Sequence, residues 1–163
     1  MRFVPIFRQR VIKMKYTYQI VRVKKENYAL FDDMVFWREK GFERVQMESS
    51  VPRRVKKELK NRNLFVYAVE IDGRYVGWIS LVYIPKIGKW KNGGHIYVDE
   101  LWVAPPFRGL GLGKILMWQA EILRKKLRAE GIRLYVNEEN EAAKNLYESC
   151  FYAENGKAIF MEK

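Results

Sequence analysis

The sequence predicts one α/β domain of the α+β kind, in which helices cover the faces of a mostly antiparallel sheet. Its 163 residues, 48% of them hydrophobic, are enough to bury one core. No Pro/Ser-rich linker, repeat or low-complexity tract divides the chain. Strand-like segments outnumber helical ones, and the two kinds are mixed along the chain. We therefore expect a single domain over residues 1–163.

Six segments carry strand signals, namely alternating apolar residues and enrichment in β-branched and aromatic side chains. Two of them are joined by Asp72-Gly73, a dipeptide typical of a tight hairpin turn. Another is closed by Ala104-Pro105-Pro106. The predicted strands cover residues 16–23, 64–71, 75–84, 95–103, 132–136 and 158–162.

Four segments show helical spacing or the start and stop signals of helices. In the strongest of them, Leu116, Ala120 and Leu123 share one face, and Gly131 is a natural stop. Gly41 is expected to end the first helix. The predicted helices cover residues 26–40, about 50–61, 111–130 and 139–149.

The chain is strongly basic, with a formal charge of +12. Such a field attracts nucleic acids, acidic proteins, anionic lipid or a phosphorylated cofactor, and charge alone does not choose among them. Cys150 is the only cysteine, which excludes an internal disulfide and a structural zinc site. We therefore expect a reducing, cytoplasmic environment. The abundance of Lys and Glu resembles that of proteins from heat-loving organisms.

The first residues are basic and lack the long apolar core of a secretory signal. No run of eighteen apolar residues is present, so no membrane span is expected. Two hypotheses for the N-terminus stay open. Translation starts at Met1, or it starts at Met14 and residues 1–15 are a basic extension.

Residues 108–113 read Arg-Gly-Leu-Gly-Leu-Gly and lie between a predicted strand and the strongest predicted helix. The start of a helix offers free N–H groups and partial positive charge to phosphate oxygens, and glycines allow close approach. A dinucleotide fingerprint counted from Gly109 fails at Lys114. A P-loop fails because Ile115 follows Lys114. The loop therefore predicts a phosphate site that takes neither NAD nor ATP.

This loop and the preceding strand, Leu101 to Gly113, resemble motif A of the GNAT acetyltransferases, whose signature is Arg/Gln-x-x-Gly-x-Gly/Ala. Asn140 and Tyr147 resemble motif B of that family at its usual separation. The clear resemblance covers about residues 99–152. It implies a GNAT-like mixed sheet of about six to seven strands, splayed at a cofactor slot and flanked by about four helices, with acetyl-CoA as co-substrate.

The resemblance also implies how acetyl-CoA is held. Backbone groups at the end of the 95–103 strand would pair with the pantetheine arm. The loop amides and Arg108 would hold the pyrophosphate, and Asn140 would touch the pantetheine or a neighbouring water. The implied cofactor-binding residues are Leu101, Trp102, Val103, Arg108, Gly109, Leu110, Gly111, Leu112, Gly113, Asn140 and Tyr147. No metal is implied.

The resemblance makes Tyr147 the acid that protonates the departing thiolate, although position alone would make it an ordinary helix aromatic. Asp99 and Glu100 are the candidates for the general base that an attacking amine needs. Neighbouring side chains on a strand face opposite sides, so only one of the two carboxylates should point at the acceptor. The alternative is that both are solvated side chains at the end of the strand. Where relatives carry a glycine that ends the helix, this chain has Phe151. Either Phe151 accepts a strained dihedral, or the helix ends differently.

We thus expect an N-acetyltransferase that acts on a protein N-terminus, a lysine or a small-molecule amine. The resemblance implies that segments 36–50 and 85–94 shape the acceptor pocket. In the second segment, Lys86, Lys89 and Lys91 favour an acidic peptide or protein over a polyamine. Two alternatives stay open: a basic RNA-binding protein, and a non-catalytic acetyl-CoA-binding domain. RNA binding as the main function is disfavoured, because no RNA-binding signature is present and the cations are spread over many elements. A homodimer stays open.

Overall fold

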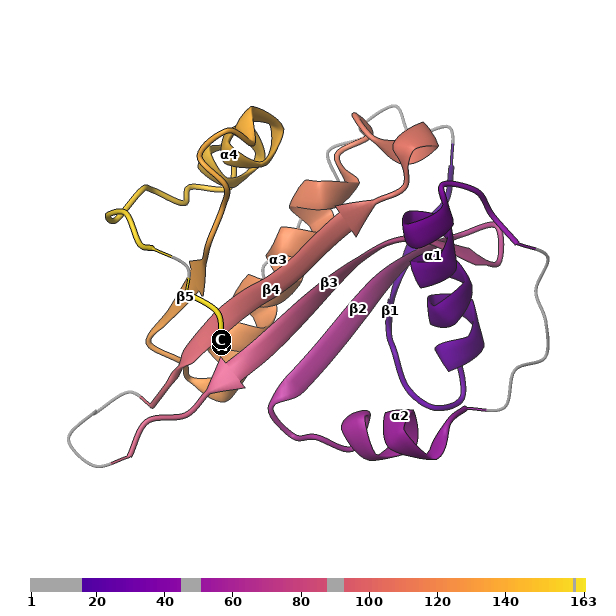
Figure 1. The fold of residues 1–163 in the computed structure, drawn as a ribbon, viewed down its shortest axis with the longest axis horizontal. Coiled ribbons are helices and arrows are strands. Elements are labelled where there is room, and N and C mark those ends of the chain that lie inside the picture. Colours follow the sequence, from indigo (N-terminus) through magenta and orange to yellow (C-terminus); the bar gives the residue numbers. More distant parts are fainter. Residues whose placement is uncertain (1–15, 45–50, 88–92, 160) are drawn as a thin grey trace, which may run out of the picture.

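The computed structural model describes residues 16–44, 51–87, 93–159 and 161–163 (Figure 1). Five strands form one sheet in the order β1-β2-β3-β4-β5. The first three pairings are antiparallel and the β4–β5 pairing is parallel. The elements are β1 (Gln19–Arg22), α1 (Tyr28–Lys40), α2 (Arg53–Glu58), β2 (Leu64–Ile71), β3 (Arg74–Ile84), β4 (His95–Val103), the 3-10 turn η1 (Pro105–Phe107), α3 (Leu112–Leu127), β5 (Gly131–Leu134) and α4 (Glu141–Glu148).

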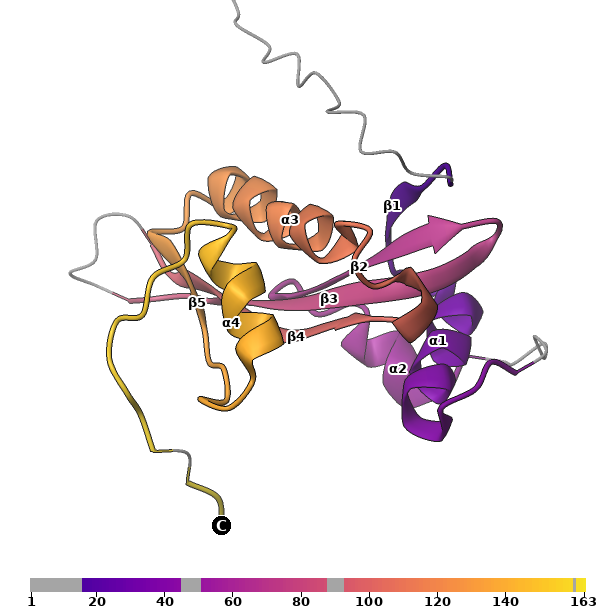
Figure 2. The same cartoon turned by 90° about the horizontal axis from the view of Figure 1, so that it is seen from above.

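The helices lie on both faces of the sheet. In Figure 2, α3 lies above the sheet and α1 and α2 lie below it, while α4 lies near β5. The larger apolar cluster joins the sheet to α3 and includes Ile79 and Leu116. The smaller cluster joins β2 and β3 to α1 and includes Met34 and Trp78. The mixed class and the four α-helices agree with the sequence prediction.

The predicted count of six to seven strands is wrong, because the described residues form a sheet of five. The missing one was expected at 158–162, and the described residues of that segment form no strand. Ile159 and Met161 are 89% and 85% exposed. Since strand propensity reflects packing on a half-buried surface, an apolar run that packs against nothing has little to hold it as a strand.

Two turns follow the sequence closely. Asp72 and Gly73 both have positive φ, 51° and 75°, as a two-residue hairpin turn between β2 and β3 requires. Gly41 ends α1 in the left-handed conformation, with φ 82°, and its N–H donates to the Trp37 carbonyl at 2.8 Å. These turns fix the end of α1 and the junction of β2 and β3.

The end of α3 differs from the prediction. The helix stops at Leu127, three residues before the predicted end, and Arg128 takes the left-handed conformation with φ 54°. The Ala129 N–H donates to the Arg124 carbonyl at 3.0 Å, which closes a Schellman-type end around a buried alanine. Gly131 is therefore no helix stop; it opens β5 opposite His95.

No helix within the described ranges is long and apolar enough to cross a bilayer. The choice between Met1 and Met14 concerns residues that lie outside those ranges.

Candidate active site

A slot opens between β4 and β5. Their parallel pairing begins at His95 opposite Gly131 and ends at Val98 opposite Leu134. β4 nevertheless continues to Val103, which pairs with Gly77 of β3 on its other side. Over 99–103, no described strand pairs with the β5-facing edge of β4 (Figure 1). An open strand edge offers N–H and C=O groups to an extended ligand, as an added strand would use them.

A β-bulge lies where this open edge begins. Glu100 pairs with Ser80 and Val98 pairs with Leu81, so Asp99 is the extra residue on β4. A bulge bends the strand and changes the direction of its side chains. The simple alternation that was expected to point Asp99 and Glu100 to opposite sides is therefore interrupted at this position.

The two carboxylates have different surroundings. Glu100 Oε1 accepts a hydrogen bond from Arg38 Nη1 at 2.7 Å, and the Arg38 guanidinium lies 5.3 Å from the Trp78 ring centroid. No cation in the described ranges pairs with Asp99. Partial desolvation, and then the neighbouring Glu100, raise the pKa of the Asp99 carboxyl above its usual value. A raised pKa makes a carboxylate a better base, so Asp99 is the more suitable of the two.

The start of α3 presents free backbone amides. Gly109 and Gly111 have φ of 76° and 81°, a conformation that glycine adopts readily. No described residue accepts a hydrogen bond from the amides of Gly109 to Lys114. The first turn of α3 contains no acidic residue. Free amides and the helix dipole without a competing carboxylate suit a phosphate group.

Arg108 ties this loop to the slot. Its Nε donates to the Val103 carbonyl at 2.9 Å, so the guanidinium is held at the end of β4. The structure thereby brings Leu101, Trp102 and Val103 of the open edge next to the phosphate loop. One carbonyl predicted to serve the pantetheine arm, that of Val103, accepts this hydrogen bond.

Gly113 has a role that the sequence did not indicate. A Cβ on Gly113 would lie 2.9 Å from Leu146 Cδ2, so its lack of a side chain lets α4 pack closely on the first turn of α3. Leu110 and Leu112 complete the loop, and Leu112 is fully buried in the larger cluster. The loop that contains the free amides therefore also determines how closely α4 packs on α3.

On α4, Asn140 is the N-cap, because its Oδ1 accepts from the Ala143 N–H at 3.1 Å. Such capping is typical of asparagine, and the sequence could have indicated it. Tyr147 packs against the larger cluster, with its ring 6.4 Å from that of Tyr152. Burial, and then Cys150, raise the pKa of the Tyr147 phenol. It therefore keeps its proton at neutral pH, as an acid must.

The end of α4 decides between the two alternatives for Phe151. Its φ is 67°, in the left-handed region, and its side chain is 99% exposed. The Tyr152 N–H donates to the Tyr147 carbonyl at 3.0 Å and the Phe151 N–H to the Glu148 carbonyl at 2.9 Å. These bonds form a Schellman motif. Phe151 accepts the strained conformation, and the motif anchors the backbone of Tyr147.

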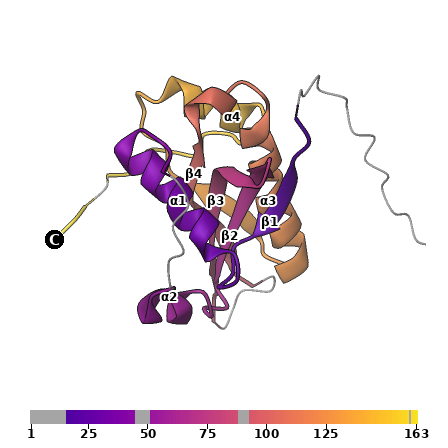
Figure 3. The same ribbon diagram turned by 90° about the vertical axis from the view of Figure 1, so that its right-hand side faces the viewer.

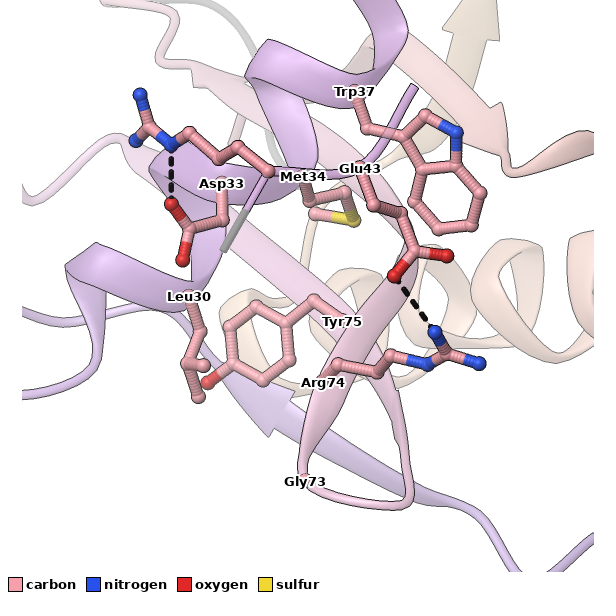
Figure 4. Close-up of a pocket in the computed structure, with 9 residues that line it drawn as sticks. Leu30, Asp33, Met34, Trp37, Glu43, Gly73, Arg74 and Tyr75 are labelled. Carbon is pink, nitrogen blue, oxygen red and sulfur yellow. Dashed lines mark hydrogen bonds and ion pairs between the residues drawn. The ribbon is translucent and has the colours of Figure 1, made fainter. Parts of the chain in front are cut away.

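A cavity of about 210 Å³ lies apart from these residues, between α1, the segment after it and the β2–β3 turn (Figure 4). Its charged lining is already paired: Arg44 binds Asp32 and Asp33, and Arg74 binds Glu43 at 2.7 Å. It contains none of the predicted site residues. In the described ranges, no group of His, Cys, Asp or Glu could hold a metal ion.

The predicted acceptor segments are described only in part. Residues 45–50 and 88–92 lie outside the described ranges, and Lys89 and Lys91 fall among them. In the described part, Phe42 is 60% exposed and Trp37 is buried. Sequence reasoning missed Arg38 as the partner of Glu100, because the two are 62 positions apart and no local pattern links them.

Comparison with known proteins gives a consistent picture. The profile described as the Acetyltransferase (GNAT) family matches residues 28–151. A search of curated protein sequences finds no match. An aminoglycoside acetyltransferase from an uncultured soil metagenomic sample, in complex with trehalose, superposes with TM-score 0.75 at 18% identity, covering 90% of this chain and 95% of that one.

Two further solved structures are similar. The aminoglycoside acetyltransferase AAC(6')-Iy, in complex with a CoA bisubstrate analog, has TM-score 0.70 and 14% identity over 90% of this chain and 98% of that one. A ribosomal-protein-alanine N-acetyltransferase from Brucella melitensis has TM-score 0.67 and 16% identity over 90% of this chain and 100% of that one. At these identities the likeness concerns the fold.

Proposed function

The chain belongs to the GNAT acetyltransferase family, and from that premise we propose that it transfers an acetyl group from acetyl-CoA directly to the amine of a peptide or protein. One observation carries the proposal. The open edge of β4 over 99–103 leads, through Arg108, to free amides at the start of α3. This combination suits a ligand that has an extended arm at one end and a pyrophosphate at the other.

Acetyl-CoA supplies an acetyl group activated as a thioester. The amides of Gly109 to Gly113 and the free Nη groups of Arg108 would hold its pyrophosphate, and the backbone groups of Leu101 and the N–H of Val103 would pair with its pantetheine arm. The backbone groups of Trp102 face β3 instead, because the N–H of Ala104, two residues further along the chain, donates to the Val76 carbonyl. An amide near Leu101 would polarise the thioester carbonyl. The Asn140 side-chain oxygen already caps α4, which leaves its amide NH₂ for the pantetheine or a water.

The chain's own side chains would move two protons. An aliphatic amine with a pKa near ~10.4 must lose a proton before it can attack. The Asp99 carboxylate would accept that proton, directly or through a water. As the new C–N bond forms and the C–S bond breaks, the Tyr147 phenol would donate its proton to the sulfur, and the excess proton on the nitrogen would return to the phenolate through solvent. No covalent enzyme intermediate is needed.

The acceptor side favours amines without a high density of positive charge. Glu100 is the other carboxylate at the bulge, and Arg38 already binds it. The chain carries a formal charge of +12, which repels polycations. A peptide amine with neutral or acidic neighbours does not need Glu100 to bind its charge, and the positive charge of the protein does not repel it. The similar solved structures include aminoglycoside acetyltransferases and a ribosomal-protein-alanine N-acetyltransferase, so they support the fold and do not choose between acceptor classes.

A panel of acceptors tests this proposal. CoA release would be measured with peptides that have acidic or basic residues after a free N-terminus, with spermidine, and with sisomicin. We expect the acidic peptides to have the highest kcat/KM. Arg38→Gln should raise kcat/KM for spermidine several-fold, because it frees Glu100. Polycations reacting best with the wild-type enzyme would refute the peptide proposal, and no turnover with any amine would favour the non-catalytic alternative.

A further inference from the structure

Two segments that are distant in the sequence meet at the end of the sheet where β2 begins. The β1–α1 connection and α2 lie side by side there (Figures 1 and 3). Arg22 Nη2 donates to the Leu64 carbonyl at 3.4 Å, and Leu59, just after α2, packs in the same apolar cluster as Val23 and Tyr28. We call residues 22–26 and 53–62 the basic end.

The basic end holds much of the chain's net charge. It contains nine Lys or Arg and two Glu, so it contributes seven of the twelve net positive charges. Apart from the half-buried Arg22, its cations are exposed. A local excess of this size creates a positive potential that attracts anions.

The described residues of the protein leave most of this charge unpaired. The two acids are already paired, Glu26 with Lys25 at 3.6 Å and Glu58 with Arg54 at 2.7 Å. No carboxylate in the described part of the chain pairs with the remaining exposed cations, which are Lys24, Arg53, Lys56, Lys57, Lys60 and Arg62. Arg53, Lys56 and Lys57 follow helical i, i+3, i+4 spacing and so share one face of α2. Like charges on one face are unfavourable unless an anion binds there.

The chemistry of this surface fits a nucleic acid better than a protein. Interfaces between proteins have an apolar core inside a polar rim. The exposed large apolar side chains of the described residues all lie elsewhere, and none belongs to the basic end. Binding to a phosphate backbone needs only cations, which release counterions, and no apolar anchor.

We propose that the basic end binds the phosphate backbone of nucleic acid, without sequence preference, as a second property beside acetyl transfer. The sequence disfavoured nucleic acid because its cations are spread over many elements; the fold gathers two of these segments on one surface. This surface differs from the phosphate loop, since it lies by the start of β2, whereas Arg108 binds the last residue of β4. The proposal does not depend on which amine is acetylated.

Fluorescence anisotropy with a labelled single-stranded RNA of about twenty nucleotides, and with DNA of the same sequence, tests the proposal. The full chain would be compared with Lys56→Gln/Lys57→Gln/Lys60→Gln. A matched control is Lys125→Gln/Lys126→Gln/Arg128→Gln, which removes the same charge from the C-terminal end of α3. Calorimetry with acetyl-CoA and circular dichroism would report whether each variant is folded.

We expect wild-type binding that weakens steeply with salt, a reduction of about one in the salt slope for each lysine removed from the basic end, and a much smaller change in the control. Equal affinities for RNA and DNA would show that the protein binds the phosphate backbone alone. Binding of RNA without binding of DNA would identify RNA as the ligand. Equal losses in both variants would mean an effect of net charge and would overturn the proposal. Absence of binding at low salt, or equal competition by polyglutamate, would overturn it as well.

Discussion

The loop at Gly109 to Lys114 and the bulge at Asp99 and Glu100 lie at the two ends of one short stretch of chain, yet they are built differently. The loop offers backbone amides, whose directions glycines and a helix start fix locally. The bulge offers two carboxylates, and one of them is bound by Arg38 from another element. Local sequence therefore determines the geometry of the loop, whereas tertiary contacts determine the surroundings of the two carboxylates.

This difference leads to separable effects. Changes to the side chains of Asp99 and Tyr147 should alter the rate and leave acetyl-CoA affinity intact. Changes to the loop backbone should alter affinity first. The predictions below use this separation.

Asp99→Asn should have the largest effect, a loss of roughly a thousandfold in kcat, because general base catalysis contributes about 10²–10⁴-fold. Since Asp99 must be ionised and its pKa is raised, kcat/KM should fall on the acid side at a pH above the usual carboxyl value of ~3.9. That acid limb should be absent in the variant. Steady-state rates across pH and calorimetry with acetyl-CoA would measure both effects.

Glu100→Gln is the matched control for Asp99→Asn, because it removes the neighbouring carboxylate that Arg38 binds. Its rate should change only a few-fold. A larger loss in Glu100→Gln than in Asp99→Asn would reverse the assignment of the base.

Tyr147→Phe should lower kcat by about a hundredfold, at the low end of the range for a general acid, since its raised pKa lies far from neutrality. Tyr152→Phe is the control: this ring packs against Tyr147, and its buried hydroxyl has no hydrogen-bond partner among the described residues. Its rate should stay the same. Equal rates in the two variants would make Tyr147 a packing residue.

Phe151→Gly should have the smallest effect and raise stability by about 1 kcal/mol, because the left-handed conformation costs glycine little. Phe151→Ala keeps the strained backbone, and since the Phe151 ring is fully exposed, it should leave stability nearly unchanged. Urea unfolding would compare the free energies. Stabilisation by both substitutions would show that the ring, not the backbone, is unfavourable.

The parts that sequence predicted well are those under local control. The Asp72-Gly73 hairpin, the end of α1 at Gly41 and the bounds of β2 and β4 depend on turn chemistry and strand pattern. The end of α3 was predicted too late, because the burial of Ala129 stabilises a left-handed Arg128 before Gly131 is reached. The strand expected at 158–162 had the composition of a strand but no packing partner.

The site shows the same division. The loop from Arg108 to Gly113 could be predicted from its glycines and the following helix. The bulge at Asp99 depends on the register with β3, and the Arg38–Glu100 pair depends on how α1 crosses the sheet. Neither can be recognised in the local sequence, which is why the proposal of Asp99 over Glu100 as the base rests on the structure.

The most direct test of the central claim is calorimetric titration of acetyl-CoA into Gly111→Ala and Gly41→Ala. The two glycines have nearly identical backbones, φ 81° and ψ 3° against φ 82° and ψ 2°, so the left-handed conformation costs an alanine about the same at both positions. Both variants should lose about 1 kcal/mol of stability. Only Gly111→Ala should weaken acetyl-CoA binding, by at least about tenfold, or 1.4 kcal/mol. Equal affinity in the two variants would contradict a pyrophosphate site at the start of α3.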